Sequence, residues 1–70
     1  MARHFEFVGG SSAKFWEATV TSSPSPFVTV RYGRIGTHGQ SQATAFASLE
    51  AAQKHADRMT AEKLKHGYVE

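Results

Sequence analysis

The 70-residue sequence predicts an α+β fold, a four-stranded antiparallel β-sheet with one C-terminal amphipathic helix packed on it. Two observations lead to this prediction. Residues 1–47 are divided by glycine, serine and proline into short runs rich in aromatic and β-branched residues, which is typical of strands joined by short loops. From Ser48 onwards, apolar residues recur at three- and four-residue steps, which is the period of a helix.

The first strand is expected over residues 3–8. Phe5 and Phe7 lie two positions apart and therefore on one face of that strand. The run 9–12, Gly-Gly-Ser-Ser, then ends the strand with turn residues.

The second strand is expected over residues 14–21. Alternation divides it into two faces, one with Trp16, Ala18 and Val20 and the other with Phe15, Glu17 and Thr19. Because Phe15 and Trp16 are adjacent, one of the two aromatic rings must lie on the less apolar face. The pattern leaves open which of them is more exposed.

A surface loop is expected over residues 22–26, Ser-Ser-Pro-Ser-Pro, because two prolines without amide donors do not fit inside a sheet ladder. A third strand follows over residues 27–35. After a glycine-bounded turn at 36–39, a fourth strand of weaker apolar character is expected over 40–46. The short connections between these strands predict an antiparallel meander.

The helix is expected to begin after Ser48, a suitable N-cap, with Glu50 in its first turn and Gly67 as a left-handed C-cap. Its apolar stripe consists of Leu49, Ala52, Ala56, Met59, Thr60 and Leu64. This stripe must cover one face of the sheet. Most of the core volume is then expected from Phe5, Phe7, Phe46 and one of the pair Phe15 and Trp16.

Composition limits the class of protein. With 40% hydrophobic and 20% charged residues the chain is an ordinary globular mixture, expected to form a single domain over residues 1–70. No cysteine is present, which excludes disulfides, thiolate nucleophiles and cysteine-based metal sites. The sequence contains no apolar run long enough to span a bilayer and no signal-peptide pattern, so a cytoplasmic location is expected.

Catalysis and cofactor binding are not expected. So small a domain has no room for an enclosed cofactor cavity, and no Ser, His and Asp are spaced as a catalytic relay. The four histidines are scattered, with His4 on the first strand, His38 in the turn, and His55 and His66 three turns apart on the helix. They are expected to be surface residues without a metal.

The segment 30–40 is the densest cluster of candidate binding residues. Tyr32 and Arg34 are expected on one face of the third strand and Arg31 on the other. An aromatic ring beside a guanidinium suits a nucleotide, which offers a base or sugar to stack and a phosphate to bind. The alternative is a tight turn in which Tyr32 is packed and Arg34 is solvated. The glycines match neither the phosphate loop nor the dinucleotide fingerprint.

Charge is compatible with an anionic ligand but does not establish one. Residues 1–47 carry four basic and two acidic side chains, whereas residues 48–70 carry four of each. All of the net charge of +2 therefore lies in the first two thirds of the chain.

Four ordered segments resemble the WGR domain family. They are Tyr32-Gly33-Arg34-Ile35-Gly36-x-x-Gly39-Gln40, Lys14-Phe15-Trp16-Glu17, Ser48-Leu49-Glu50-Ala51-Ala52 and Lys65-His66-Gly67-Tyr68. Together they extend over about residues 4–69. The family's architecture, a sheet with one helix packed on it, is the same as that predicted above.

The resemblance implies a non-catalytic module that binds nucleic acid. WGR domains of poly(ADP-ribose) polymerases bind DNA at strand breaks, and others occur in bacterial proteins. By resemblance, Tyr32 takes the place of the namesake tryptophan that stacks near the DNA end, and Arg34 that of the bridging arginine. The glycines at 33, 36 and 39 hold the loop shape. The candidate nucleic-acid-binding residues are Lys14, Arg31, Tyr32, Gly33, Arg34 and Gln40.

Two departures from the family pattern modify this expectation. The ring of Tyr32 is smaller than that of the namesake tryptophan, so stacking should be weaker. The sequence contains no catalytic or zinc-finger neighbour, which favours a stand-alone module of the bacterial type with DNA ends or nicks as ligand. The alternative is a protein–protein module that uses the same face or an exposed strand edge.

Overall fold

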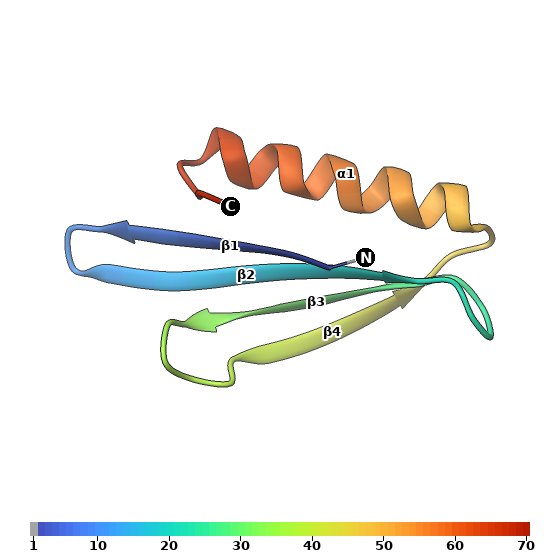
Figure 1. Ribbon diagram of the computed structural model, residues 1–70, viewed down its shortest axis with the longest axis horizontal. Coiled ribbons are helices and arrows are strands. Elements are labelled where there is room, and N and C mark those ends of the chain that lie inside the picture. Colours follow the sequence, from blue (N-terminus) through green and yellow to red (C-terminus); the bar gives the residue numbers. More distant parts are fainter. Residues whose placement is uncertain (1) are drawn as a thin grey trace.

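A single helix covers one face of a four-stranded antiparallel sheet in the computed structural model, which describes residues 2–70 (Figure 1). The elements are β1 (Ala2–Gly9), β2 (Ser12–Thr21), β3 (Phe27–Arg34), β4 (Gln40–Ala45) and α1 (Leu49–Lys65). Consecutive strands are neighbours in the order β1-β2-β3-β4. The predicted α+β meander is confirmed, with strand ends that differ by one or two residues.

The strand register sorts the side chains onto two faces. Phe5 pairs with Trp16, which pairs in turn with Tyr32, so all three lie on the face that α1 covers. Phe5, Trp16 and Ala18 of the sheet form one buried cluster, near the C-terminal half of α1. Val28 of β3 forms a second with Ala52 and Ala56 of the helix itself. The alanines allow the helix to approach the sheet closely.

Both members of the adjacent aromatic pair are buried. Trp16 is 3% exposed below the helix, and Phe15 is 5% exposed on the opposite, open face. Phe15 is shielded there by the side chains of His4 and Arg31 and by Gly39 of the β3–β4 loop. The open face therefore buries an aromatic ring of its own, beneath polar side chains and the loop.

Both ends of the helix are formed by the residues that the sequence predicts. The Ser48 hydroxyl accepts a hydrogen bond from the Ala51 amide at 3.1 Å, and Gly67 adopts a φ of +92°. Val69 and Glu6 then exchange two backbone hydrogen bonds of 2.8 Å, which returns the chain to β1. This reversal brings Tyr68 back over the sheet, against the ring of Phe7.

The predicted apolar stripe is wrong at its two ends. The helix is buried at Ala52, Ala56 and Thr60, whereas Leu49 and Leu64 are 48% and 49% exposed. Both leucines lie at the ends of the helix, beyond these three buried positions. Leu64 is also turned about 40° further round the axis than Thr60, since four residues exceed one full turn. Phe7 and Phe46 are half-buried rather than central to the core.

α1 is too short and too polar to cross a membrane, and it is the one helix within residues 2–70.

Candidate nucleic-acid interface

Functional side chains gather at one end of the molecule. Figure 1 shows the β1–β2 turn, the β3–β4 loop and the C-terminal end of α1 at the same end of the fold, on the left in that view. The β2–β3 register pairs Lys14 with Arg34 and Trp16 with Tyr32, so these side chains share the face that α1 covers. Arg31 pairs with Glu17 and points to the open face. This confirms the prediction that Tyr32 and Arg34 lie on one face of the third strand and Arg31 on the other.

Two open hollows adjoin each other at this end. One has a volume of 330 Å³, and its lining includes Lys14, Tyr32, Gly33, Arg34 and Tyr68. The other, of 270 Å³, lies between β3 and α1, and its lining includes Trp16, Tyr32, Gln42, Lys63 and Tyr68. Both share the two tyrosines. We call the surface formed by Lys14, Tyr32, Arg34, Lys63 and Tyr68 the basic–aromatic groove; among residues 2–70, no carboxylate lines either hollow.

The two lysines of the groove lie over aromatic rings. The Lys63 ammonium is 5.6 Å from the ring centre of Trp16 and 5.3 Å from that of Tyr68. The Lys14 ammonium is 5.2 Å from the ring centre of Phe7 and 5.8 Å from that of Tyr68. Cation–π attraction therefore holds both charges at the groove.

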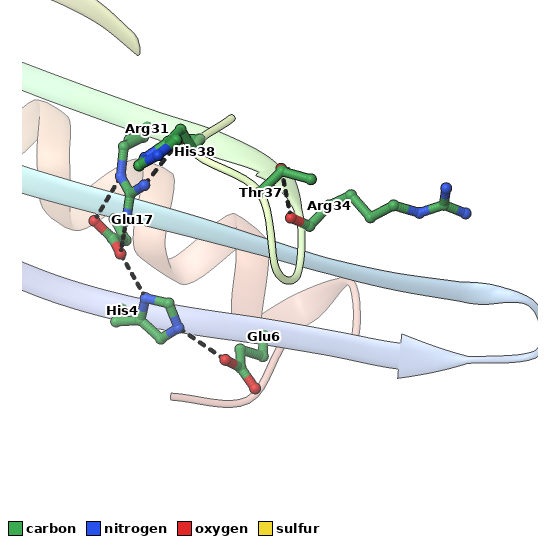
Figure 2. A network of polar contacts seen from close by, with 7 residues as sticks. All are labelled: His4, Glu6, Glu17, Arg31, Arg34, Thr37 and His38. Atoms are coloured by element: carbon green, nitrogen blue, oxygen red, sulfur yellow. Dashed lines mark hydrogen bonds and ion pairs between the residues drawn. The ribbon is translucent and has the colours of Figure 1, made fainter. Parts of the chain in front are cut away.

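Arg34 is the freely extended cation of the groove. Its side chain reaches away from the loop and strands, as Figure 2 shows, and no other side chain in the described part of the chain pairs with its guanidinium. Its backbone carbonyl accepts hydrogen bonds from the hydroxyl and the amide of Thr37, at 2.7 and 3.1 Å. The main chain is thus fixed while the five guanidinium donors are available to a ligand.

Tyr32 presents a ring that is partly exposed and oriented by a polar contact. It is 36% exposed, and its hydroxyl donates to Oε1 of Gln40 at 3.3 Å. Gln40 follows the loop at the first position of β4 and pairs with Tyr32 across the strands. Of the six candidate binding residues, Lys14, Tyr32, Gly33, Arg34 and Gln40 therefore come together at this end, on or beside the groove.

Arg31 belongs to a separate polar network on the open face (Figure 2). Its guanidinium bonds both carboxylate oxygens of Glu17, at 2.7 and 3.2 Å, and donates to the His38 carbonyl at 2.9 Å. It lies 4.7 Å over the ring centre of Phe15. His4 connects Glu17, at 2.8 Å, with Glu6, at 3.0 Å.

This network shifts two pKa values in opposite directions. Hydrogen bonds from Arg31 first, and then from His4, lower the pKa of the Glu17 carboxyl. Hydrogen bonds to Glu6 first, and then to Glu17, raise the pKa of His4. Across residues 2–70, no group of three or more histidine or acidic side chains is placed to hold a metal ion.

The raised pKa of His4 predicts a pH dependence of stability. Its contribution is fully present below the unfolded pKa of about 6.5 and is lost as the pH rises through the higher folded value. Because the side chain is 49% exposed, the effect is expected to be small. Urea unfolding of the wild type and His4→Gln between pH 5.5 and 9 measures it. The stability advantage of the wild type should shrink as the pH rises; a constant difference would contradict the network.

Glycines allow the β3–β4 loop to fold onto the open face. Gly36 and Gly39 have φ values of +95° and +70°. A Cβ on Gly33 would stand 2.6 Å from the Gly39 Cα, so the two backbones touch where the loop crosses β3. These positions fit the loop-shaping role that the resemblance implies for them.

Lys63 and Tyr68 were not among the residues predicted for the site. They come from the last turn of α1 and from the segment after it, far from the cluster at 30–40. The signal for Tyr68 is the C-cap glycine, since a left-handed Gly67 reverses the chain and returns the next residue towards the sheet. No such local signal marks Lys63.

The structure is thus a small α+β domain that exposes a basic and aromatic groove beside a glycine-rich turn. The model of the WGR domain family matches residues 1–70, and the chain belongs to this family. WGR domains are generally linked to nucleic-acid binding.

Two similar proteins are much longer than this chain. Protein YehF of Escherichia coli K12 is 37% identical over 68 residues, which cover 97% of the chain and 24% of YehF. A protein of Bacteroides fragilis with a solved crystal structure superposes with a TM-score of 0.91 and 43% identity, over 99% of this chain and 19% of that one. The chain thus spans a quarter or less of the length of either relative, and independent action of this domain stays a prediction.

Proposed function

We propose that this domain binds DNA at ends or nicks through the basic–aromatic groove, without catalysing a reaction. The observation that carries the proposal is the composition of the groove. Three cations, Lys14, Arg34 and Lys63, surround two tyrosine rings, and within the described residues no carboxylate opposes them in the lining. Membership of a family linked to nucleic-acid binding supports the same function.

Each part of the groove suits one part of the ligand. The extended Arg34 guanidinium can bind a phosphate through two parallel hydrogen bonds, while the lysines supply point charges. The Tyr32 ring can stack on a sugar or base that has no stacked neighbour on one side. A DNA end or nick exposes such a sugar or base. With only three cations to contact phosphates, weak, micromolar binding is expected, and phosphate contacts carry little sequence preference.

The salt dependence of binding tests this proposal. With three phosphates neutralised, affinity for a 5′-phosphorylated nicked duplex should fall roughly 40-fold between 50 and 200 mM salt. Arg34→Ala should weaken binding and reduce that fall to roughly 12-fold, because one phosphate contact is lost. An NMR titration of labelled protein measures both quantities and should show shifts at residues 32–40 and at Lys63 and Tyr68.

Arg58→Ala is the matched control, since Arg58 is an exposed arginine of α1 outside the groove. It should bind like the wild type. Binding that is insensitive to salt, or equally weakened in both variants, would contradict the groove as the binding surface.

The exposed edge of the sheet supports a second candidate function, docking of a partner protein. All six residues of β4 are exposed, and they include neither a charged residue nor a proline that would oppose pairing with another strand. Absence of any NMR shift with DNA at low salt would favour this function over the first.

A further inference from the structure

The β3–β4 loop is packed onto the open face, behind the groove. A Cβ on Gly39 would stand 2.3 Å from the Tyr32 carbonyl oxygen and 2.8 Å from Cζ of Phe15. Gly39 therefore lies directly against the main chain that carries Tyr32 and against the buried ring on the open face. The conformation of this loop and the placement of Tyr32 and Arg34 are coupled through that contact.

Arg31 connects the strands to the middle of this loop. Its guanidinium donates to the His38 carbonyl at 2.9 Å while Glu17 holds it from the other side at 2.7 Å. It also covers the ring of Phe15, on which Gly39 rests. One planar side chain thus holds the loop carbonyl, the strand carboxylate and the aromatic ring in one arrangement.

The same contacts make Arg31 a poor phosphate ligand. It points away from Tyr32 and Arg34, and three of its five donors are already engaged, two by the oxygens of Glu17 and one by the His38 carbonyl. A phosphate that bound the Nε and Nη2 edge through two parallel hydrogen bonds would have to displace the Glu17 carboxylate, which is 27% exposed. We infer that Glu17 and Arg31 are positioning residues, which fix the loop 35–39 from the open face and thereby orient the groove residues Tyr32 and Arg34.

The expected effect of this pair on DNA binding rests on the proposed function. Glu17→Gln distinguishes a positioning role of Arg31 from direct contact with DNA, because the two roles predict opposite changes in DNA affinity. If Arg31 contacted DNA, removal of the competing negative charge would strengthen binding. If the pair positions the loop, the weaker hold on Arg31 should weaken binding roughly five-fold. The salt dependence should stay that of the wild type, because no phosphate contact is removed.

Arg31→Lys is a second variant, which keeps the charge but loses the planar fork. It should also weaken binding with unchanged salt dependence. Glu6→Gln is the control, because Glu6 is a carboxylate on the same face that bonds the His4 side chain and not Arg31. It should leave both the loop and the binding as in the wild type.

A readout in the free protein makes the inference independent of DNA. Glu17→Gln and Arg31→Lys should shift the backbone amides of residues 35–39 and lower their heteronuclear NOE values, whereas Glu6→Gln should not. Unchanged loop amides in both variants, or tighter DNA binding by Glu17→Gln, would overturn the inference. If the wild type binds no DNA, the proposed function fails, and the loop amides alone decide the positioning role.

Discussion

Gly39→Ala is expected to destabilise the domain by roughly 3 to 5 kcal/mol, because backbone strain and overpacking add at this position. Its φ of +70° lies in the left-handed region. The new Cβ would also stand 2.3 Å from the Tyr32 carbonyl oxygen, a backbone atom that cannot move without disturbing β3. A domain of this size has a free energy of unfolding of about 4 to 10 kcal/mol, so much of its stability would be lost. Urea unfolding measures the change.

Gly36→Ala is the matched control in the same loop. Its φ of +95° is also unfavourable for alanine, but a Cβ there would meet nothing within 4 Å. The expected cost is therefore only the left-handed strain, about 1 to 2 kcal/mol. Equal losses in the two variants would contradict the close approach of Gly39 to β3. In a Gly39→Ala protein that still folds, DNA binding should be weakened as well, since the loop orients Tyr32.

The two faces of the sheet could be predicted because strand geometry is local. Alternation alone places Trp16 opposite in direction to Glu17, and Tyr32 opposite to Arg31, and the register confirms both. The helix limits were equally local, since Ser48 and Gly67 act on the backbone of their own turns. The WGR signature then identified the family that the comparison confirms.

Burial of Phe15 depends on tertiary structure and could not be read from its own strand. Alternation places its ring on the mixed face with Glu17. Its cover comes from three other places: His4 on β1, Arg31 on β3 and the returning loop at Gly39. No periodicity within one element reports that a loop will fold back over a neighbouring strand.

Only part of the groove could be predicted, because its other residues also depend on tertiary structure. Lys14 and Arg34 follow from the register of two neighbouring strands. Lys63 and Tyr68 reach the groove only because α1 runs back along the sheet and its C-terminal segment pairs with β1 at Glu6. To place that segment, both the length of the helix and its packing on the sheet must be known. The predicted apolar stripe gave the wrong packing for the last turn, where Leu64 is exposed.

Phe5→Ala is expected to be the most destabilising truncation in the core, at roughly 3 to 5 kcal/mol. The Phe5 side chain is fully buried, its ring centre lies 5.8 Å from that of Trp16, and the Arg3 guanidinium lies 5.2 Å from it. Truncation leaves a cavity between β1, β2 and the helix that these rigid neighbours cannot fill. Chemical unfolding at low temperature measures the loss, and Phe5→Leu provides a milder variant, at about 1 kcal/mol, if the alanine variant does not fold.

Phe7→Ala gives the like-for-like comparison, because Phe7 is the same residue type on the same strand and face but is only half-buried. It should cost clearly less stability than Phe5→Ala, since much of its ring already contacts water. It should instead disturb Tyr68 and Lys14, whose ring and ammonium lie over it. The two variants thus separate the core from the groove: Phe5→Ala lowers stability most, whereas Phe7→Ala weakens DNA binding more than its stability loss explains. Equal stability losses would contradict the placement of Phe5 at the centre of the core.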